Sequence, residues 1–176
     1  MKKILRMTLI IMIFIGVVAC NKDVVKEKEE PVKEENVVKV EDAEKLFKGY
    51  CTELYTIKDP SHPPTFDEIA DNIKGYVSED RFKAQIADRR YQIPELVAKE
   101  LNKSIEVLAV NLEEQSVNDN GTIDYTYKTV FKVYDENSSE TYEKEGELTI
   151  SIINNELKIT REWSRGVKID GLKGYL

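Results

Sequence analysis

Residues 122–134, "TIDYTYKTVFKVY", decide the fold, because apolar and polar side chains alternate along them with a period of two. This spacing predicts a β-strand that buries one face and exposes the other. Aromatic and β-branched residues dominate the stretch, as expected for a strand packed against a core. The predicted buried face comprises Ile123, Tyr125, Tyr127, Thr129, Phe131 and Val133.

Strand candidates flank this stretch on both sides, and turn signals join them to it. Residues 105–117 precede it, across "NDNG" at 118–121, which is a strong hairpin signal. After "DENSSE" at 135–140 a third strand runs to the Asn154–Asn155 turn, and a fourth follows. Their predicted inner faces comprise Tyr142, Leu148, Ile150 and Ile152, then Leu157, Ile159, Arg161 and Trp163. The pattern indicates a four-stranded antiparallel meander.

Four segments before the strands have helical spacing instead. A first helix is predicted over 42–56, Thr65 and Glu68 form a capping box for a second, Ser78 caps a third, and Pro94 suits the first turn of a fourth. Their apolar faces comprise Ala43, Leu46, Phe47, Tyr50, Cys51 and Leu54; Phe66, Ile69, Ala70 and Ile73; Phe82 and Ile86; and Leu96, Val97 and Leu101. The order predicts an α+β domain with N-terminal helices packed on a curved antiparallel sheet.

A register for the sheet follows if Asn120–Gly121 and Asn154–Asn155 are two-residue turns and 136–139 is a four-residue loop. It pairs Gly146 with Trp163, and opposite charges face each other on the outer side. The inner row across the sheet then comprises Glu114, Tyr127, Leu148 and Arg161.

Two charges in that row suggest a pocket, because charges on an apolar face are expensive. The side chains expected to line it are Glu114, Tyr125, Tyr127, Arg161 and Trp163. Arg161 would bind a carboxylate or phosphate, and Glu114 would accept hydrogen bonds. The alternative is that both charges lie near a solvated end of the sheet or pair with helix charges.

The first nineteen residues carry an export signal. A basic start at Lys2, Lys3 and Arg6 precedes the apolar run 7–18, which is too short to span a bilayer comfortably. The box Val17-Val18-Ala19-Cys20 resembles the bacterial lipoprotein signal. The resemblance implies that Cys20 receives a diacylglycerol bearing fatty acids such as palmitate, and that cleavage makes it the first mature residue. An uncleaved membrane anchor and a plain secretory signal are the alternatives.

The mature chain is acidic. Removing the three basic residues of the leader leaves 23 basic against 33 acidic residues, a net charge of −10. Such a chain has no electrostatic reason to bind nucleic acid or anionic phospholipid. Residues 20–41 lack aromatic residues and glycine and read as a charged tether, with a surface helix interrupted by Pro31 as the alternative. Residues 42–176 match the size of a single domain.

The order of elements, together with "GYVSEDRF" at 75–82 and "ITREWSR" at 159–165, is similar to the NTF2-like superfamily. The resemblance covers about residues 42–165. It implies a cone-shaped α+β fold in which a curved sheet wraps helices around a pocket. A cystatin-like sheet with fewer helices is the alternative fold.

Residues for catalysis or metal binding are sparse. His62 is the single histidine and has no partner suggested by spacing, and Cys51 lies on an apolar helical face, where a buried inert thiol is expected. We expect no metal and no cofactor. The interpretation is a non-catalytic domain, lipid-anchored on the extracytoplasmic face of the cell membrane, that binds an envelope protein or a small ligand. An NTF2-like enzyme is the alternative.

The C-terminal stretch "GVKIDGLKGYL" at 166–176 spaces its apolar residues with three glycines. We expect it to pack against the domain. The alternative is a flexible strand offered to a partner.

Overall fold

The computed structural model describes residues 38–176, so the predicted signal peptide, Cys20 and the tether up to residue 37 lie outside the described residues. The helices are α1 (Val40–Tyr55), α2 (Phe66–Ile73), α3 (Glu79–Ala87), the short 3-10 helix η1 (Arg90–Gln92) and α4 (Ile93–Leu101). The strands are β1 (Ser104–Val117), β2 (Ile123–Tyr134), β3 (Ser139–Ile153) and β4 (Glu156–Ser164).

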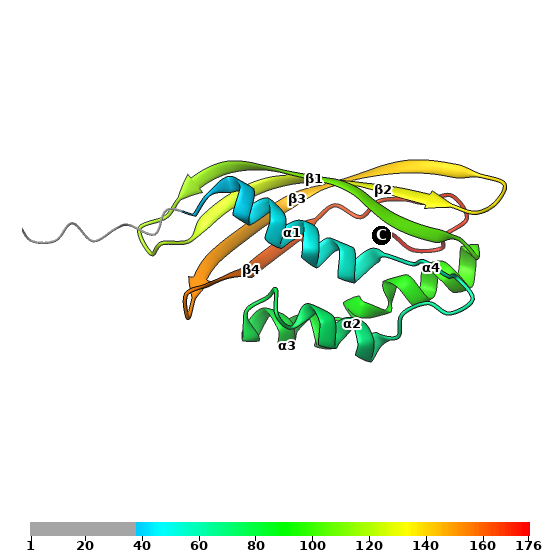
Figure 1. Cartoon of the computed structure of the whole chain (residues 1–176), viewed down its shortest axis with the longest axis horizontal. Helices are drawn as coiled ribbons and strands as arrows, with labels where there is room; N and C mark the ends of the chain where they lie inside the picture. The colour runs from blue at the N-terminus through cyan, green and yellow to red at the C-terminus, as the bar shows by residue number, and fades with distance from the viewer. Residues whose placement is uncertain (1–37) are drawn as a thin grey trace, which may run out of the picture. The chain divides into compact units, whose positions relative to one another are not determined.

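The strands form one antiparallel sheet in the order β1-β2-β3-β4, and the helices cover one face of it (Figure 1). Helix α1 lies against the sheet, α2 packs on α1, and α3 contacts the edge strand β4. The predicted fold class, an α+β domain with N-terminal helices on a curved four-stranded sheet, is therefore confirmed. Among residues 38–176, no helix combines the length and the apolar character needed to span a bilayer.

The predicted helix starts are present. The Thr65 hydroxyl accepts from the Glu68 N–H at 3.3 Å, while the Glu68 carboxylate accepts from the Thr65 N–H at 2.8 Å, completing the capping box of α2. Ser78 caps α3 by accepting from the Arg81 N–H, and Pro94 lies in the first turn of α4. Helix α1 begins at Val40, two residues before the predicted start.

Strand β2 has the predicted alternation, with every second side chain buried from Ile123 to Val133. The predicted register of its neighbours is wrong. The loop between β1 and β2 spans residues 118–122, and the loop between β2 and β3 spans 135–138, one position earlier than expected. The Asn154–Asn155 turn is correct, and both residues have the positive φ that such a turn requires, 53° and 64°.

A β-bulge at Thr160 breaks the alternation of β4. Ile150 pairs with Ile159, but Thr149 pairs with Arg161, so one extra residue lies between the two pairs. Because side chains alternate strictly along a strand, this extra residue exchanges the faces of everything after it. Arg161 and Trp163 thus point away from the helices, and Glu162 points toward them.

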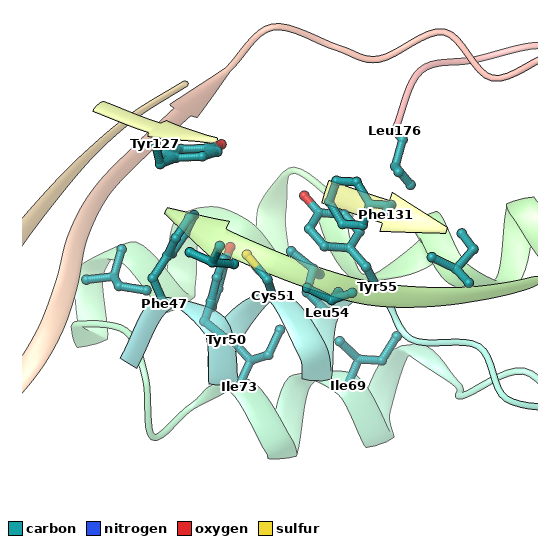
Figure 2. Close-up of a cluster of buried hydrophobic side chains, with 14 of the residues drawn as sticks. Phe47, Tyr50, Cys51, Leu54, Tyr55, Ile69, Ile73, Tyr127, Phe131 and Leu176 are labelled. Atoms are coloured by element: carbon teal, nitrogen blue, oxygen red, sulfur yellow. The ribbon is translucent and has the colours of Figure 1, made fainter. Parts of the chain in front are cut away.

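Aromatic side chains fill the space between sheet and helices (Figure 2). The ring of Phe47 lies 4.6 Å from that of Tyr127, and Tyr55 meets Phe131 edge-on at 5.0 Å between centroids. Leu176 belongs to the same cluster of buried side chains as Phe131 and Tyr55 (Figure 2).

The C-terminal stretch 166–176 packs against the domain, as predicted, and buries Ile169, Leu172 and Leu176. Val167 and Leu176 exchange backbone hydrogen bonds of 3.1 and 2.9 Å, which close this stretch into a loop. The backbone N–H of Lys173 donates to Glu100 of α4 at 2.9 Å.

Gly146 of β3 permits the close approach of β4. A Cβ atom there would lie 2.1 Å from the Trp163 carbonyl oxygen and 2.7 Å from the Tyr127 ring. We expect Gly146→Ala to lower the free energy of unfolding by about 3 kcal/mol, because a backbone oxygen cannot yield as a flexible side chain does. Urea unfolding measures this effect. Gly75→Ala is the control, since no heavy atom lies within 4 Å of its Cβ position. Equal midpoints for the two variants would contradict the strand packing described here.

Candidate functional site

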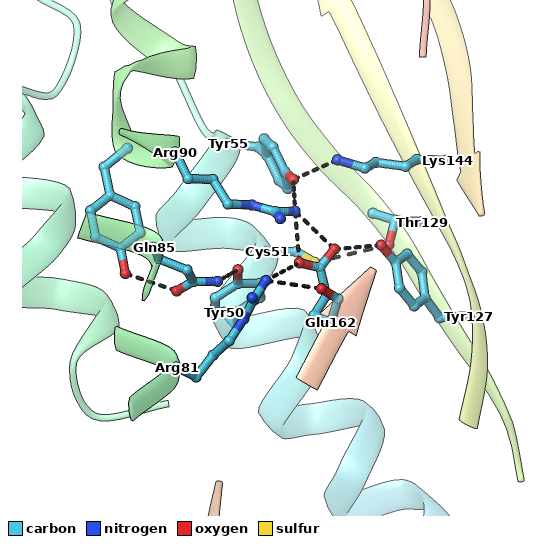
Figure 3. Close-up of polar contacts among 11 residues, drawn as sticks. Tyr50, Cys51, Tyr55, Arg81, Gln85, Arg90, Tyr127, Thr129, Lys144 and Glu162 are labelled. Atoms are coloured by element: carbon cyan, nitrogen blue, oxygen red, sulfur yellow. Dashed lines mark hydrogen bonds and ion pairs between the residues drawn. The ribbon is translucent and has the colours of Figure 1, made fainter. Parts of the chain in front are cut away.

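A buried carboxylate stands where the bulge of β4 turns the strand inward. The Glu162 side chain is 1% exposed. Its two oxygens accept from Arg81 at 3.2 Å, from Arg90 at 2.7 and 2.8 Å, and from the Tyr127 hydroxyl at 2.8 Å (Figure 3). One side chain of β4 therefore binds two helical segments and, across β3, strand β2.

Local structure positions both arginines. Arg81 is in the first turn of α3, and it donates to the Glu162 backbone carbonyl at 2.9 Å as well as to the carboxylate. Arg90 begins η1 immediately after Arg89, whose φ of 53° reverses the chain direction at the end of α3. Both segments are consequently tied to β4.

The polar cluster extends along α1. Lys144 of β3 donates to the Tyr55 hydroxyl at 2.7 Å, and Arg90 donates to the same oxygen at 3.3 Å. Separately, Gln85 of α3 donates to the Tyr50 hydroxyl at 2.6 Å and accepts from Tyr91 at 2.8 Å. Helix α3 was expected to bury Phe82 and Ile86, but both are only partly buried and Gln85 is fully buried.

The charges of this cluster are unequal. Within residues 38–176, the three cations Arg81, Arg90 and Lys144 surround the single carboxylate Glu162. Burial raises the pKa of the Glu162 carboxyl, but the positive charges of Arg90 and Lys144 outweigh it and hold that pKa below its ordinary value. Burial and the neighbouring Glu162 raise the pKa of the Tyr127 hydroxyl well above its ordinary value.

These shifts argue against acid–base chemistry in the cluster. Glu162 stays ionised and Tyr127 stays protonated near neutral pH, whereas a general acid or base works best with a pKa near the working pH. The cluster is suited to holding α3, η1, α1 and the sheet together.

The Cys51 thiol lies inside the domain. Cys51 is 2% exposed, its sulfur lies 3.9 Å from the Thr129 hydroxyl, and burial raises the pKa of the thiol to about 12. The prediction of a buried thiol is confirmed, and the raised pKa is what an unreactive thiol requires. In the part of the chain that the structure describes, no group of His, Cys, Asp and Glu residues is arranged to hold a metal ion.

The five side chains expected in one pocket are not brought together. Tyr125 and Tyr127 are buried on the inner face, but Glu114 is exposed near the end of β1. Arg161 and Trp163 lie on the outer face, where Arg161 pairs with Glu147 at 2.7 Å. The predicted row is wrong because the first two loops differ from the assumed turns and the bulge reverses the faces of β4.

Sequence reasoning missed Glu162, Arg81, Arg90 and Lys144. Strict alternation assigned Glu162 to solvent, and in a chain with 33 acidic residues a single glutamate carries no signal. In "ITREWSR" three charges lie within five residues, but this pattern does not locate a bulge in a chain that is 34% charged.

Comparison with known proteins bears on the fold. No protein-family model matches the chain, and no curated protein matches it significantly. Solved structures match over most of the described domain. CagV, a VirB8 homolog of the type IV secretion system from Helicobacter pylori, is 12% identical with a TM-score of 0.55, over 73% of this chain and 99% of that one.

Two further structures have similar coverage of this chain. An IcmL-like type IV secretion system protein from Legionella pneumophila is 10% identical with a TM-score of 0.52, over 75% of this chain and 96% of that one. An Ntf2-like protein involved in plasmid conjugation is 10% identical with a TM-score of 0.42, over 76% of this chain and 50% of that one. At such identities a likeness shows the fold alone, so the chain shares the α+β fold of CagV and of the IcmL-like protein.

Glu162→Gln is expected to lower the free energy of unfolding by about 3 kcal/mol at pH 7, because it leaves two arginines without their buried counter-charge. The matched control is Glu147→Gln, which breaks the exposed ion pair with Arg161 and should cost less than about 1 kcal/mol. Urea unfolding of both variants and the wild type at pH 7 measures the difference.

The same two variants test the direction of the Glu162 pKa shift through the pH dependence of stability. A carboxyl whose pKa is lowered by folding contributes stability above its unfolded pKa of about 4.5 and loses that contribution as the pH falls through the folded pKa. The gap between the wild type and Glu162→Gln should therefore narrow below pH 4.5. A gap that stays constant down to pH 2.5 would contradict an ionised Glu162.

Proposed function

We propose that this chain is a lipid-anchored extracytoplasmic protein whose α+β domain binds a protein partner at the cell envelope through its outer surface. The domain acts as an interaction module and performs no reaction of its own. Its anchor is the acylated Cys20, and residues between the anchor and α1 hold the domain away from the membrane.

The observation that carries this proposal is the filled interior. Aromatic rings and an ionic cluster occupy the space between helices and sheet in which a cone-shaped fold would hold a ligand. Stretch 166–176 adds Ile169, Leu172 and Leu176 to the same core. With Glu162 committed to two arginines and Cys51 inert, recognition is left to the surface.

Anchoring is supported by the lipobox Val17-Val18-Ala19-Cys20 and by its basic and apolar flanks. One acyl chain binds a membrane only marginally, whereas the acyl chains of a diacylglycerol anchor a protein stably. The acidic character of the chain would keep the domain off an anionic bilayer.

A protein partner is supported by the two secretion-system proteins that share the fold. CagV and the IcmL-like protein belong by name to type IV secretion systems, which are assemblies of many proteins. Since one fold hosts many functions, this similarity motivates the partner class and does not identify the partner.

Replacing the anchoring cysteine tests the location. Cys20→Ser should abolish incorporation of radiolabelled palmitate and move the protein out of the membrane fraction, because its thiol is the acceptor of the lipid. Cys51→Ser is the matched control, and this variant should still incorporate radiolabelled palmitate and stay in the membrane fraction. Unchanged processing and fractionation of Cys20→Ser would overturn the anchor.

Photocrosslinking in intact cells tests the interaction. A photoreactive amino acid replaces Leu96, Val117 or Lys132, three partly or fully exposed positions on α4, β1 and β2. We expect at least one position to give an adduct of defined mass with an envelope protein, identified by mass spectrometry and lost in the Cys20→Ser background. The absence of adducts from every position would contradict an interaction module.

A further inference from the structure

The outer face of the sheet carries a hollow of about 540 Å³ that crosses all four strands. Trp163 lies in it with 51% of the residue exposed, an unusual exposure for a tryptophan. The hollow is lined by Asn111, Leu112, Glu113, Thr126, Tyr127, Lys128, Glu145, Gly146, Glu147, Trp163 and Arg165. The Trp163 ring faces away from the helices, so it does not pack in the hydrophobic core.

The bulge of β4 places Trp163 in this hollow. The bulge at Thr160 turns Trp163 outward, and Gly146 allows the Trp163 backbone to approach β3 closely. Arg161 and Arg165 lie two residues to either side of Trp163 on the same face. The indole ring therefore lies on the edge strand β4, with polar lining side chains of the other three strands to one side of it.

The charges around the ring are mostly neutralised. Lys128 pairs with Glu143 at 2.9 Å and with Glu145 at 3.2 Å, and Arg161 pairs with Glu147 at 2.7 Å. Four polar side chains of the lining have no hydrogen bond or ion pair to any of residues 38–176; they are Asn111, Glu113, Arg165 and Trp163. They provide a guanidinium and an indole N–H at β4 and, across the hollow on β1, an amide and a carboxylate.

We propose that this hollow binds a neutral glycan, with one sugar ring stacked on Trp163 beside Arg165 and a further sugar unit bonded to Asn111 and Glu113 on β1, at the other edge of the sheet. The C–H face of a sugar ring is apolar and packs on an aromatic ring, while the hydroxyls at its edge both donate and accept. An amide, a carboxylate and a guanidinium satisfy both needs. The volume lies within the range of roughly 300–1,000 Å³ found for ligand sites.

Other ligand classes fit this surface less well. An anion such as phosphate would meet three lining carboxylates, Glu113, Glu145 and Glu147, against two cations, Lys128 and Arg165. A protein interface needs about 800 Å² of buried surface from each partner and a central region depleted of charged residues. Here one aromatic side chain lies beside several ion pairs. The site goes beyond the proposed function, since it assigns a ligand class that is independent of the lipid anchor.

Trp163 is the single tryptophan of the chain, so its emission reports directly on the site. The full chain, purified in a polyoxyethylene detergent that contains no sugar, is titrated with chitotetraose, cellotetraose and maltotetraose. At least one should shift the emission to the blue and protect it from acrylamide, with a Kd of about 0.1–1 mM. Inorganic phosphate should change neither the emission wavelength nor the quenching by acrylamide.

Variants separate stacking from hydrogen bonding. Calorimetry should show at least a tenfold loss of affinity for Trp163→Ala, and emission should show a several-fold loss for Arg165→Ala and Asn111→Ala. The control Lys132→Ala changes the same face of β2 outside the hollow and should bind normally.

Three results would overturn the glycan site. They are no response to 10 mM of any of the three sugars, competition by phosphate, and equal affinity of Trp163→Ala and the wild type. None of them affects the photocrosslinking result, so failure of the glycan site and failure of the proposed function are distinguishable.

Discussion

The fold depends on one buried ionic contact, between Glu162 of β4 and the guanidinium groups of Arg81 and Arg90. Short helices such as α3 have little stability of their own, so α3 and η1 keep their places because tertiary contacts hold them. A buried carboxylate that accepts several charge-assisted hydrogen bonds has few alternative partners. The contact therefore fixes where the helical layer meets the sheet, as well as holding it there.

The elements were predictable because each rests on a local rule. Alternation in β2, the Thr65 capping box and the left-handed turn at Asn154–Asn155 depend on a few consecutive residues, and the structure contains all three. Helix α1 was predicted for the same reason, from apolar residues at helical spacing. The number and order of elements then determine the layers.

The candidate site was not predictable in the same way, because it depends on register. A bulge inserts one residue and moves every later side chain of the strand to the opposite face of the sheet. The sequence pattern that accompanies it is weak. Without the extra residue at Thr160, Arg161 and Trp163 would face the helices, as the predicted pocket requires. With it, Glu162 faces the helices and forms the buried salt bridge. Arg81 and Arg90 come from segments far from Glu162 in the chain, so no local pattern joins them to it.

The bulge also gives the two faces of the sheet different roles. Without it, the indole of Trp163 would point toward the aromatic rings of Phe47 and Tyr127, and Glu162 would point toward solvent. With it, the inner face receives the carboxylate that the helical arginines require, and the outer face receives a large aromatic ring that the core does not use. The buried ion pair of Glu162 and the exposed ring of Trp163 thus have the same structural cause, the bulge at Thr160. Since the buried ion pair favours the bulged register, the exposure of Trp163 follows from the stability of the domain, and any ligand that uses this ring binds a geometry fixed by folding.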